Sequence, residues 1–118
     1  MNINKFTQKS LQAVNDLEKI AYEFGNQEVE QEHLLYALMN QEDSLIKKLI
    51  EKMEIQPQYF ANSIESAIEK RTKVSGGKPY IGNDLNTVLI TAEDEAKNMG
   101  DEYVSVEHLF LAMIHHPS

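Results

Sequence analysis

Two identical Glu-His-Leu triplets contain the residue types in this sequence that could do chemistry. They lie at Glu32-His33-Leu34 and at Glu107-His108-Leu109. A carboxylate beside an imidazole could serve acid–base catalysis or bind a metal. However, adjacent residues on a helix point about 100° apart, and metal sites in helical bundles use Glu-x-x-His, one turn apart. We therefore predict no metal site, and two buried, hydrogen-bonded structural histidines.

Other signatures of catalysis are missing from the sequence. It has no Cys and no Gly-x-Ser-x-Gly element. Pro79 follows Gly76-Gly77-Lys78, whereas a phosphate-binding loop needs Ser or Thr after the lysine. We therefore predict that the chain is not an enzyme and binds no cofactor. A small metal-dependent helical enzyme that uses the Glu-His pairs stays as the alternative from another class of function.

The two glutamates of the triplets permit a further interpretation. Each lies in the first turn of an expected helix, where a carboxylate gains about 0.3–1 kcal/mol from the helix dipole. That role in stability is sufficient to explain them. Because the triplets are repeated, Glu32 and Glu107 are also similarly placed, and they suit cationic groups on another chain.

Length and composition restrict the class of protein. The 118 residues carry a formal charge of −8, with 42% hydrophobic and 25% charged residues, which is typical of one soluble globular domain. An acidic chain is a poor partner for nucleic acid. The longest apolar runs, 34–39 and 109–114, are too short to span a bilayer, and the first residues do not resemble a signal peptide. We expect a cytoplasmic protein with neither a nucleic-acid nor a membrane partner.

The spacing of the apolar residues predicts an all-α fold, a compact bundle of short helices with little or no β-structure. A polar, Gly-rich stretch at 71–82 interrupts the pattern and is expected to be an exposed, mobile linker. The expected helices cover residues 7–24, 31–40, 44–53, a segment opened by Pro57 whose apolar face reaches Ile68, 83–99, and a segment after Ser105.

An internal duplication relates the two halves of the chain. A shift of 75 positions places Gly25 on Gly100, Val29 on Val104 and the first triplet on the second. We predict one domain, 1–118, made of repeat one (about 6–70), the linker (71–82) and a partial repeat two (83–118). A complete second copy would run to about residue 145, so we expect a truncated second repeat and an apolar surface where its remaining helices would pack.

The duplicated motif Gly-x-x-x-Val-x-x-Glu-His-Leu resembles the Clp repeat domain that precedes the ATPase rings of Clp-type AAA+ unfoldases. The segments 73–77 and 100–109 are most similar to the ClpB disaggregase branch. The ClpC branch has Gly-Thr before each Glu-His, where this sequence has Glu30-Gln31 and Ser105-Val106.

The resemblance implies a function in recruiting protein clients. In this family the domain binds exposed segments of misfolded or aggregated proteins and passes them to hexameric rings that use ATP and magnesium and work with the DnaK chaperone system. It implies a shallow client groove, with Glu32 as a possible second pocket. The groove positions are Thr7, Leu89, Asp101, Tyr103, Val104 and Glu107. The alternative within the fold is an adaptor- or phosphoarginine-binding domain of a ClpC-type proteolytic unfoldase.

Overall fold

The all-α prediction is confirmed by the computed structural model, which describes residues 3–117. A short 3-10 helix, η1 (Ile3–Lys5), precedes the α-helices. The helices are α1 (Gln8–Asn15), α2 (Leu17–Glu23), α3 (Gln31–Met39), α4 (Leu45–Lys52), α5 (Pro57–Glu69), α6 (Asn83–Asn98) and α7 (Val106–His115). The strands of the described residues are β1 (Glu28–Val29) and β2 (Tyr80–Ile81), which pair in parallel.

The first predicted helix is interrupted at Asp16, which separates α1 from α2. Asn15 and Asp16 are poor helix formers, but the backbone at Asp16 stays helical (φ −82°, ψ −10°) and its N–H still donates to the carbonyl of Gln12. The Ser10 N–H donates to the Thr7 hydroxyl oxygen at 3.2 Å, so Thr7 caps the N-terminus of α1.

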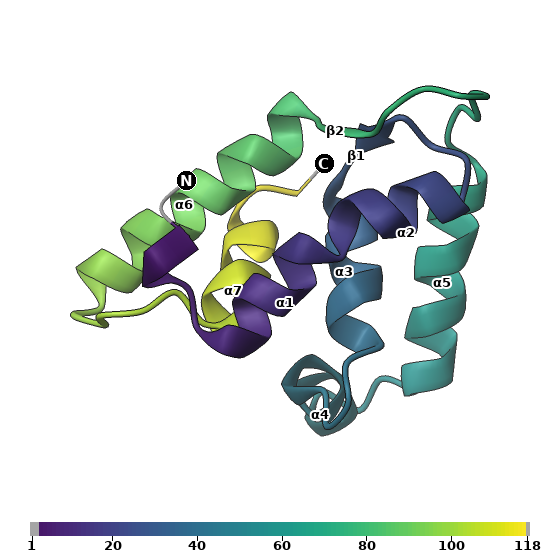
Figure 1. Ribbon diagram of the computed structural model, residues 1–118. Helices are drawn as coiled ribbons and strands as arrows, with labels where there is room; N and C mark the ends of the chain where they lie inside the picture. Colours follow the sequence, from purple (N-terminus) through teal and green to yellow (C-terminus); the bar gives the residue numbers. More distant parts are fainter. Residues whose placement is uncertain (1–2, 118) are drawn as a thin grey trace.

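The core joins two helical groups that correspond to the two repeats. In Figure 1, α3 lies beside α5 in one group, and α6 lies along α7 in the other. Leu34 of α3 and Leu109 of α7, the leucines of the two triplets, are both completely buried. The helices that precede α3 and α7 also contribute completely buried leucines, Leu17 of α2 and Leu85 of α6. Each repeat therefore contributes the same kind of apolar layer to one shared core.

The two repeats exchange short extended segments. Phe6 forms a parallel bridge with Val104, and Ile81, its counterpart 75 positions later, pairs with Val29. The hydrogen bonds match as well: the Thr7 N–H donates to the Val104 carbonyl at 3.0 Å, and the Gly82 N–H donates to the Val29 carbonyl at 2.9 Å. The segment just before α1 therefore pairs with repeat two, and the end of the linker just before α6 pairs with repeat one, so neither repeat completes this pairing by itself.

Part of the predicted linker is tied to repeat one. The Val74 N–H donates to the Gly25 carbonyl at 2.8 Å, and the Tyr80 N–H donates to the Gln27 carbonyl at 2.9 Å. The expectation of an exposed linker agrees with residues 72–76 but is wrong for Pro79 and Gly82, which are buried. The pairing with β1 explains the difference, because it draws this end of the linker against the core.

Gly25 and Gly100 end α2 and α6 in the left-handed conformation, at φ +77° and +75°. We expect Gly100→Ala to lower the free energy of unfolding by about 1 kcal/mol, because a Cβ disfavours this backbone. No atom lies within 4 Å of the position that a Cβ would take, so the loss would report backbone strain alone. Gly100→Asn is the control and should lose less, because Asn tolerates the conformation. Equal stability of all three proteins in urea would contradict the prediction.

Candidate functional site

His33 is completely buried and both of its ring nitrogens are hydrogen-bonded. The Glu30 N–H at the start of α3 donates to Nδ1 at 2.9 Å, so the proton of the neutral ring lies on Nε2, which donates to Asn26 Oδ1 at 3.0 Å. Burial lowers the pKa of His33 below its usual value, which keeps the ring neutral. The prediction of a structural histidine is confirmed here.

His108 repeats this arrangement in the second repeat. The Ser105 N–H donates to its Nδ1 at 2.9 Å, and Nε2 lies 2.8 Å from Asp101 Oδ2. The difference between the repeats is the partner, because asparagine in repeat one is replaced by an aspartate whose side chain is 47% exposed. His108 is thus structural as predicted, and Asp101, a predicted client-contact residue, also holds this ring.

Neither histidine has a free ring nitrogen that could ligate a metal ion. Within residues 3–117, no group of three or more His, Asp or Glu side chains is arranged to hold a metal. No helix in the same part of the chain has the length and apolar character needed to cross a membrane.

A hollow of about 570 Å³ lies between η1, the end of α6 and the turn into α7. Asp101 and Val104, two of the predicted groove residues, line it. Thr7 adjoins Val104 through the backbone hydrogen bond described above. Tyr103 is 49% exposed, and Glu107 is exposed in the first turn of α7. The structure therefore brings Thr7, Asp101, Tyr103, Val104 and Glu107 to one region, around the turn between α6 and α7, whereas Leu89 lies in the middle of α6.

Two of the predicted groove residues are packing residues instead of contact residues. Leu89 is 2% exposed and Val104 is 2% exposed, so their side chains belong to the core. Besides Tyr103, Met99 at the end of α6 is an exposed apolar side chain at this turn, with 60% exposure, and Ile90 in the middle of α6 is 50% exposed. The helical period predicts Met99 to face inward and gives Ile90 no role. The sequence does contain a signal for the exposure of Ile90, because this isoleucine lies outside the apolar stripe of α6.

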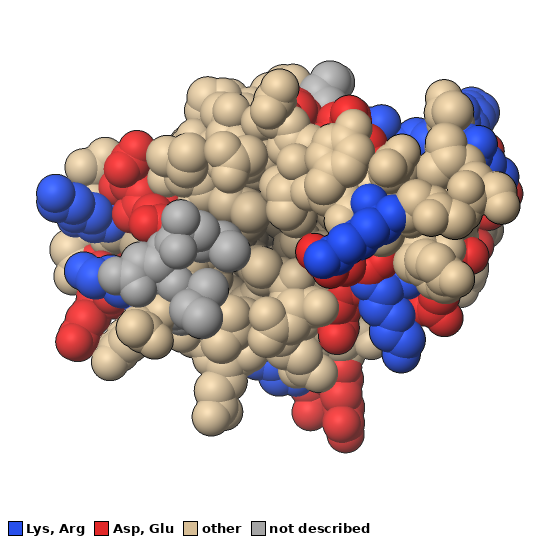
Figure 2. Space-filling model, turned by 45° about the horizontal axis from the view of Figure 1, so that its top comes forward, with Lys and Arg blue, Asp and Glu red and all other residues tan. Residues whose placement is uncertain are grey.

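The charges around the hollow are mixed. Lys5 and Lys97 line it together with acidic residues of α6 and of the turn, namely Glu93, Asp94, Asp101 and Glu102. Figure 2 shows the same character over one face of the molecule, where basic and acidic side chains alternate at both ends and uncharged residues occupy a broad area between them. Such a surface favours mixed polar and apolar partners over a polyanion.

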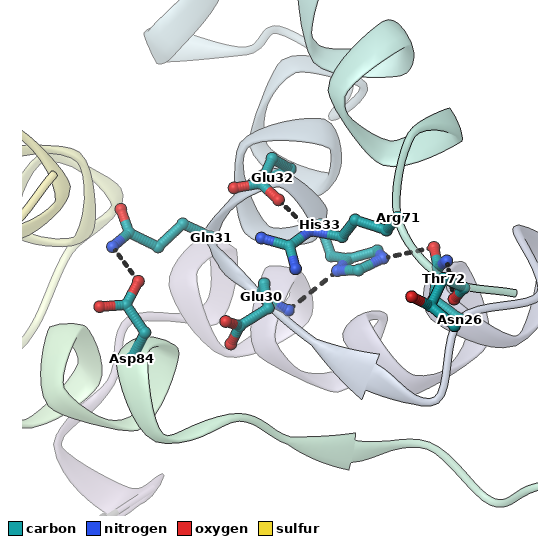
Figure 3. A network of polar contacts seen from close by, with 8 residues as sticks. All are labelled: Asn26, Glu30, Gln31, Glu32, His33, Arg71, Thr72 and Asp84. Carbon is teal, nitrogen blue, oxygen red and sulfur yellow. Dashed lines mark hydrogen bonds and ion pairs between the residues drawn. The ribbon is translucent and has the colours of Figure 1, made fainter. Parts of the chain in front are cut away.

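Glu32 lies elsewhere and forms an ion pair with Arg71, which follows α5 (Figure 3). Its side chain is only 15% exposed, and that of Arg71 is 29% exposed. In Figure 1 the start of α3 lies near the middle of the molecule, whereas the turn between α6 and α7 lies at its left edge. The structure therefore does not bring Glu32 together with the residues of the α6–α7 turn.

A second carboxyl of this region, Glu30, is buried with 8% exposure at the start of α3. Its Oε1 atom has no hydrogen-bond partner within the part of the chain that the structure describes. Burial, followed by the neighbouring Glu28 carboxylate, raises the pKa of Glu30 to about 7. Gly82 packs directly on this group, since a Cβ there would come within 2.1 Å of Oε1.

Comparisons with known proteins agree with this architecture. The family model described as the Clp repeat (R) N-terminal domain matches residues 5–118. The chaperone protein ClpB of Nitratidesulfovibrio vulgaris is 43% identical over 123 residues, which cover 100% of this chain and 14% of that relative.

Solved structures share the fold at lower identity. The Hsp104 N-terminal domain from Candida albicans superposes with a TM-score of 0.86 at 19% identity, over 95% of this chain and 75% of that one. The N-domain of ClpV in complex with a VipB peptide superposes with a TM-score of 0.80 at 20% identity, over 96% and 69% of the two chains. The family match over nearly all residues and the ClpB relative together show that this chain belongs to the Clp repeat N-terminal domain family.

Proposed function

We propose that this chain is the client-recruiting N-terminal domain of a ClpB-type, ATP-dependent disaggregase. Its own activity is reversible binding of exposed segments of misfolded or aggregated proteins, without covalent chemistry. The observation that carries the proposal is the exposure of two large apolar side chains, Met99 and Tyr103, which are next in sequence to Gly100 and Val104 in the wall of the hollow with mixed charges. Apolar contact without a deep pocket suits weak, sequence-tolerant binding.

The comparisons support a peptide-binding role at a coarse level, since a ClpV domain of the same fold is described in complex with a peptide. We propose that the whole protein acts in the cytoplasm as a hexameric AAA+ ring that binds ATP and magnesium and cooperates with the DnaK chaperone system. The chain spans about one seventh of the ClpB relative that it matches, so these properties concern the larger protein.

In the proposed groove, Tyr103 and the neighbouring apolar side chains accept apolar residues of the client. Asp101 and Glu107 attract basic residues beside them, and Thr7, Leu89 and Val104 support the surface through the cap and the core. The alternative is an adaptor-binding domain of a ClpC-type unfoldase. Phosphoarginine recognition in that alternative would depend on Glu32 and Glu107, of which Glu32 is already paired.

Titration with a permanently unfolded protein such as casein, followed by ¹⁵N NMR, tests the proposal. We expect shifts confined to the α6–α7 turn and its neighbours. Tyr103→Ala should weaken binding roughly threefold to tenfold, because an exposed aromatic anchor is removed. Tyr59→Ala is the matched control, since Tyr59 of α5 is 71% exposed and lies outside the groove. Silence at Tyr103, Val104 and Glu107 in the wild-type protein would overturn the proposal.

A further inference from the structure

The pairing of β1 with β2 encloses a buried carboxyl group. Glu30, which follows β1, is 8% exposed, and Gly82, which follows β2, packs directly on it. A Cβ at Gly82 would lie 2.1 Å from Glu30 Oε1 and 2.9 Å from Glu28 Cγ, so glycine is the residue that lets the chain pass this close to both side chains. Residues 28–30 and 80–82 are called the β1–β2 junction below.

The surroundings of the Glu30 carboxyl penalise its charged form. Oε1 has no hydrogen-bond partner among the described residues, and the guanidinium that faces it is already bonded to Glu32. An ionised Glu30 would add negative charge beside Glu28 and Asp84. The titratable side chains around this carboxyl come from the strands and from three helical parts of the chain: Glu28 of β1, Tyr80 of β2, Glu32 and His33 of α3, Arg71 after α5 and Asp84 of α6.

The equivalent pairing around Val104 is built without these carboxyls. A shift of 75 positions places Glu30 on Ser105 and Glu28 on Tyr103. The backbone pairing there is of the same parallel kind. The two pairings between the repeats therefore differ in whether ionisable carboxyls occupy these positions, and the pairing around Val104 is an internal control for the β1–β2 junction.

The segment 80–82 can leave β1 without a rearrangement of the helices. Its first and last N–H groups each donate to a carbonyl of repeat one at 2.9 Å, and residues 72–76, which precede it in the linker, are exposed. On its other side, the Gln31 side-chain amide donates to Asp84 Oδ2 at 2.8 Å and keeps the start of α6 on α3 (Figure 3). Release of the segment therefore costs two backbone hydrogen bonds and leaves α6 in place.

We propose that the β1–β2 junction is a pH-dependent switch, in which the neutral Glu30 carboxyl holds the segment 80–82 against β1 and the ionised carboxyl releases it. Burial and the Glu28 carboxylate raise the pKa of Glu30 from 4.5 to about 7 in the closed junction, whereas water solvates the carboxylate once the segment has left. Opening therefore releases a proton between these two pH values, and rising pH favours it. The inference goes beyond the proposed function, because it concerns the joining of the two repeats and involves no client.

Amide hydrogen exchange at a series of pH values tests the inference on the wild-type chain, because it reports local opening residue by residue. After correction for the intrinsic exchange rate, the protection factors of the Tyr80 and Gly82 amides should fall roughly tenfold per pH unit up to about pH 7. They should level off above that pH, where both states are ionised. The Thr7 and Val104 amides, which belong to the other pairing, should keep constant protection.

Glu30→Gln should remove the pH dependence at the β1–β2 junction. Glu65→Gln, which removes one negative charge from an exposed position of α5, is the matched control and should keep it. Constant protection of the Tyr80 and Gly82 amides in the wild type, or a fall that persists in Glu30→Gln, would overturn the inference. A parallel fall at the Thr7 and Val104 amides would also overturn it, because the whole domain would then be unfolding. No client is present in this experiment, so its outcome is independent of the casein titration.

Discussion

Replacing His33 with leucine is expected to lower the free energy of unfolding by about 3 kcal/mol. The substitution leaves two groups without their partner, the Glu30 N–H and the Asn26 side-chain carbonyl, both on buried residues. Each unsatisfied buried group costs about 1–3 kcal/mol. Urea unfolding followed by circular dichroism measures the loss.

His108→Leu is the matched control and is expected to lose only about 1 kcal/mol. Its two partners can reach water, since Ser105 is half-buried and the Asp101 side chain is 47% exposed. Comparable losses in the two variants would show that the histidines contribute through packing alone, and would contradict this account of the difference between the repeats.

Glu30→Gln is expected to stabilise the protein above neutral pH by roughly 3 kcal/mol, the scale of a shift in pKa from 4.5 to about 7. The folded state of the wild-type protein binds the Glu30 proton more tightly than the unfolded state does. The protonated Glu30 therefore contributes to the free energy of unfolding, and its contribution is complete below pH 4.5. It is lost as the pH rises through about 7. The glutamine variant carries no charge and should lack this part of the pH dependence.

Unfolding curves at a series of pH values between 4 and 9 measure this effect, with Glu28→Gln as the control. Glu28 is exposed but its charge helps to raise the pKa of Glu30, so its removal should shift the loss of stability to lower pH without abolishing it. If Glu30→Gln and the wild type lose stability in parallel over this range, Glu30 is already ionised in the folded protein and the prediction is wrong.

The exchange of extended segments has a consequence for folding. The Phe6–Val104 bridge joins residues near both ends of the chain, and the Ser10 hydroxyl also donates to the Val104 carbonyl, at 2.6 Å. Ile81, just before α6, pairs in turn with Val29 of repeat one. Because each repeat pairs with a segment next to the other, the folding of either repeat favours the folding of the other. We therefore interpret the two repeats as one cooperative folding unit, although they are separate segments of the sequence.

Local patterns in the sequence were sufficient for the helices and the duplication. Apolar spacing predicts the helices to within a few residues, apart from the break between α1 and α2 at Asp16, because the period of 3.6 residues is a property of the helix itself. The Glu-His-Leu triplets also predict the structural histidines, since both partners of each ring lie within seven residues of it along the chain.

The sequence by itself determined an all-α, duplicated domain whose triplets have a structural role. The tertiary structure decided which carboxylate is free and which apolar side chain is exposed. Glu32 and Glu107 occupy equivalent positions in the sequence, but only a contact across 39 residues pairs Glu32 with Arg71. Leu89 and Ile90 are adjacent apolar residues, and the packing of α6 on α7 buries the first and exposes the second. A local period defines the face of a helix, whereas the neighbour that covers it depends on contacts between distant segments.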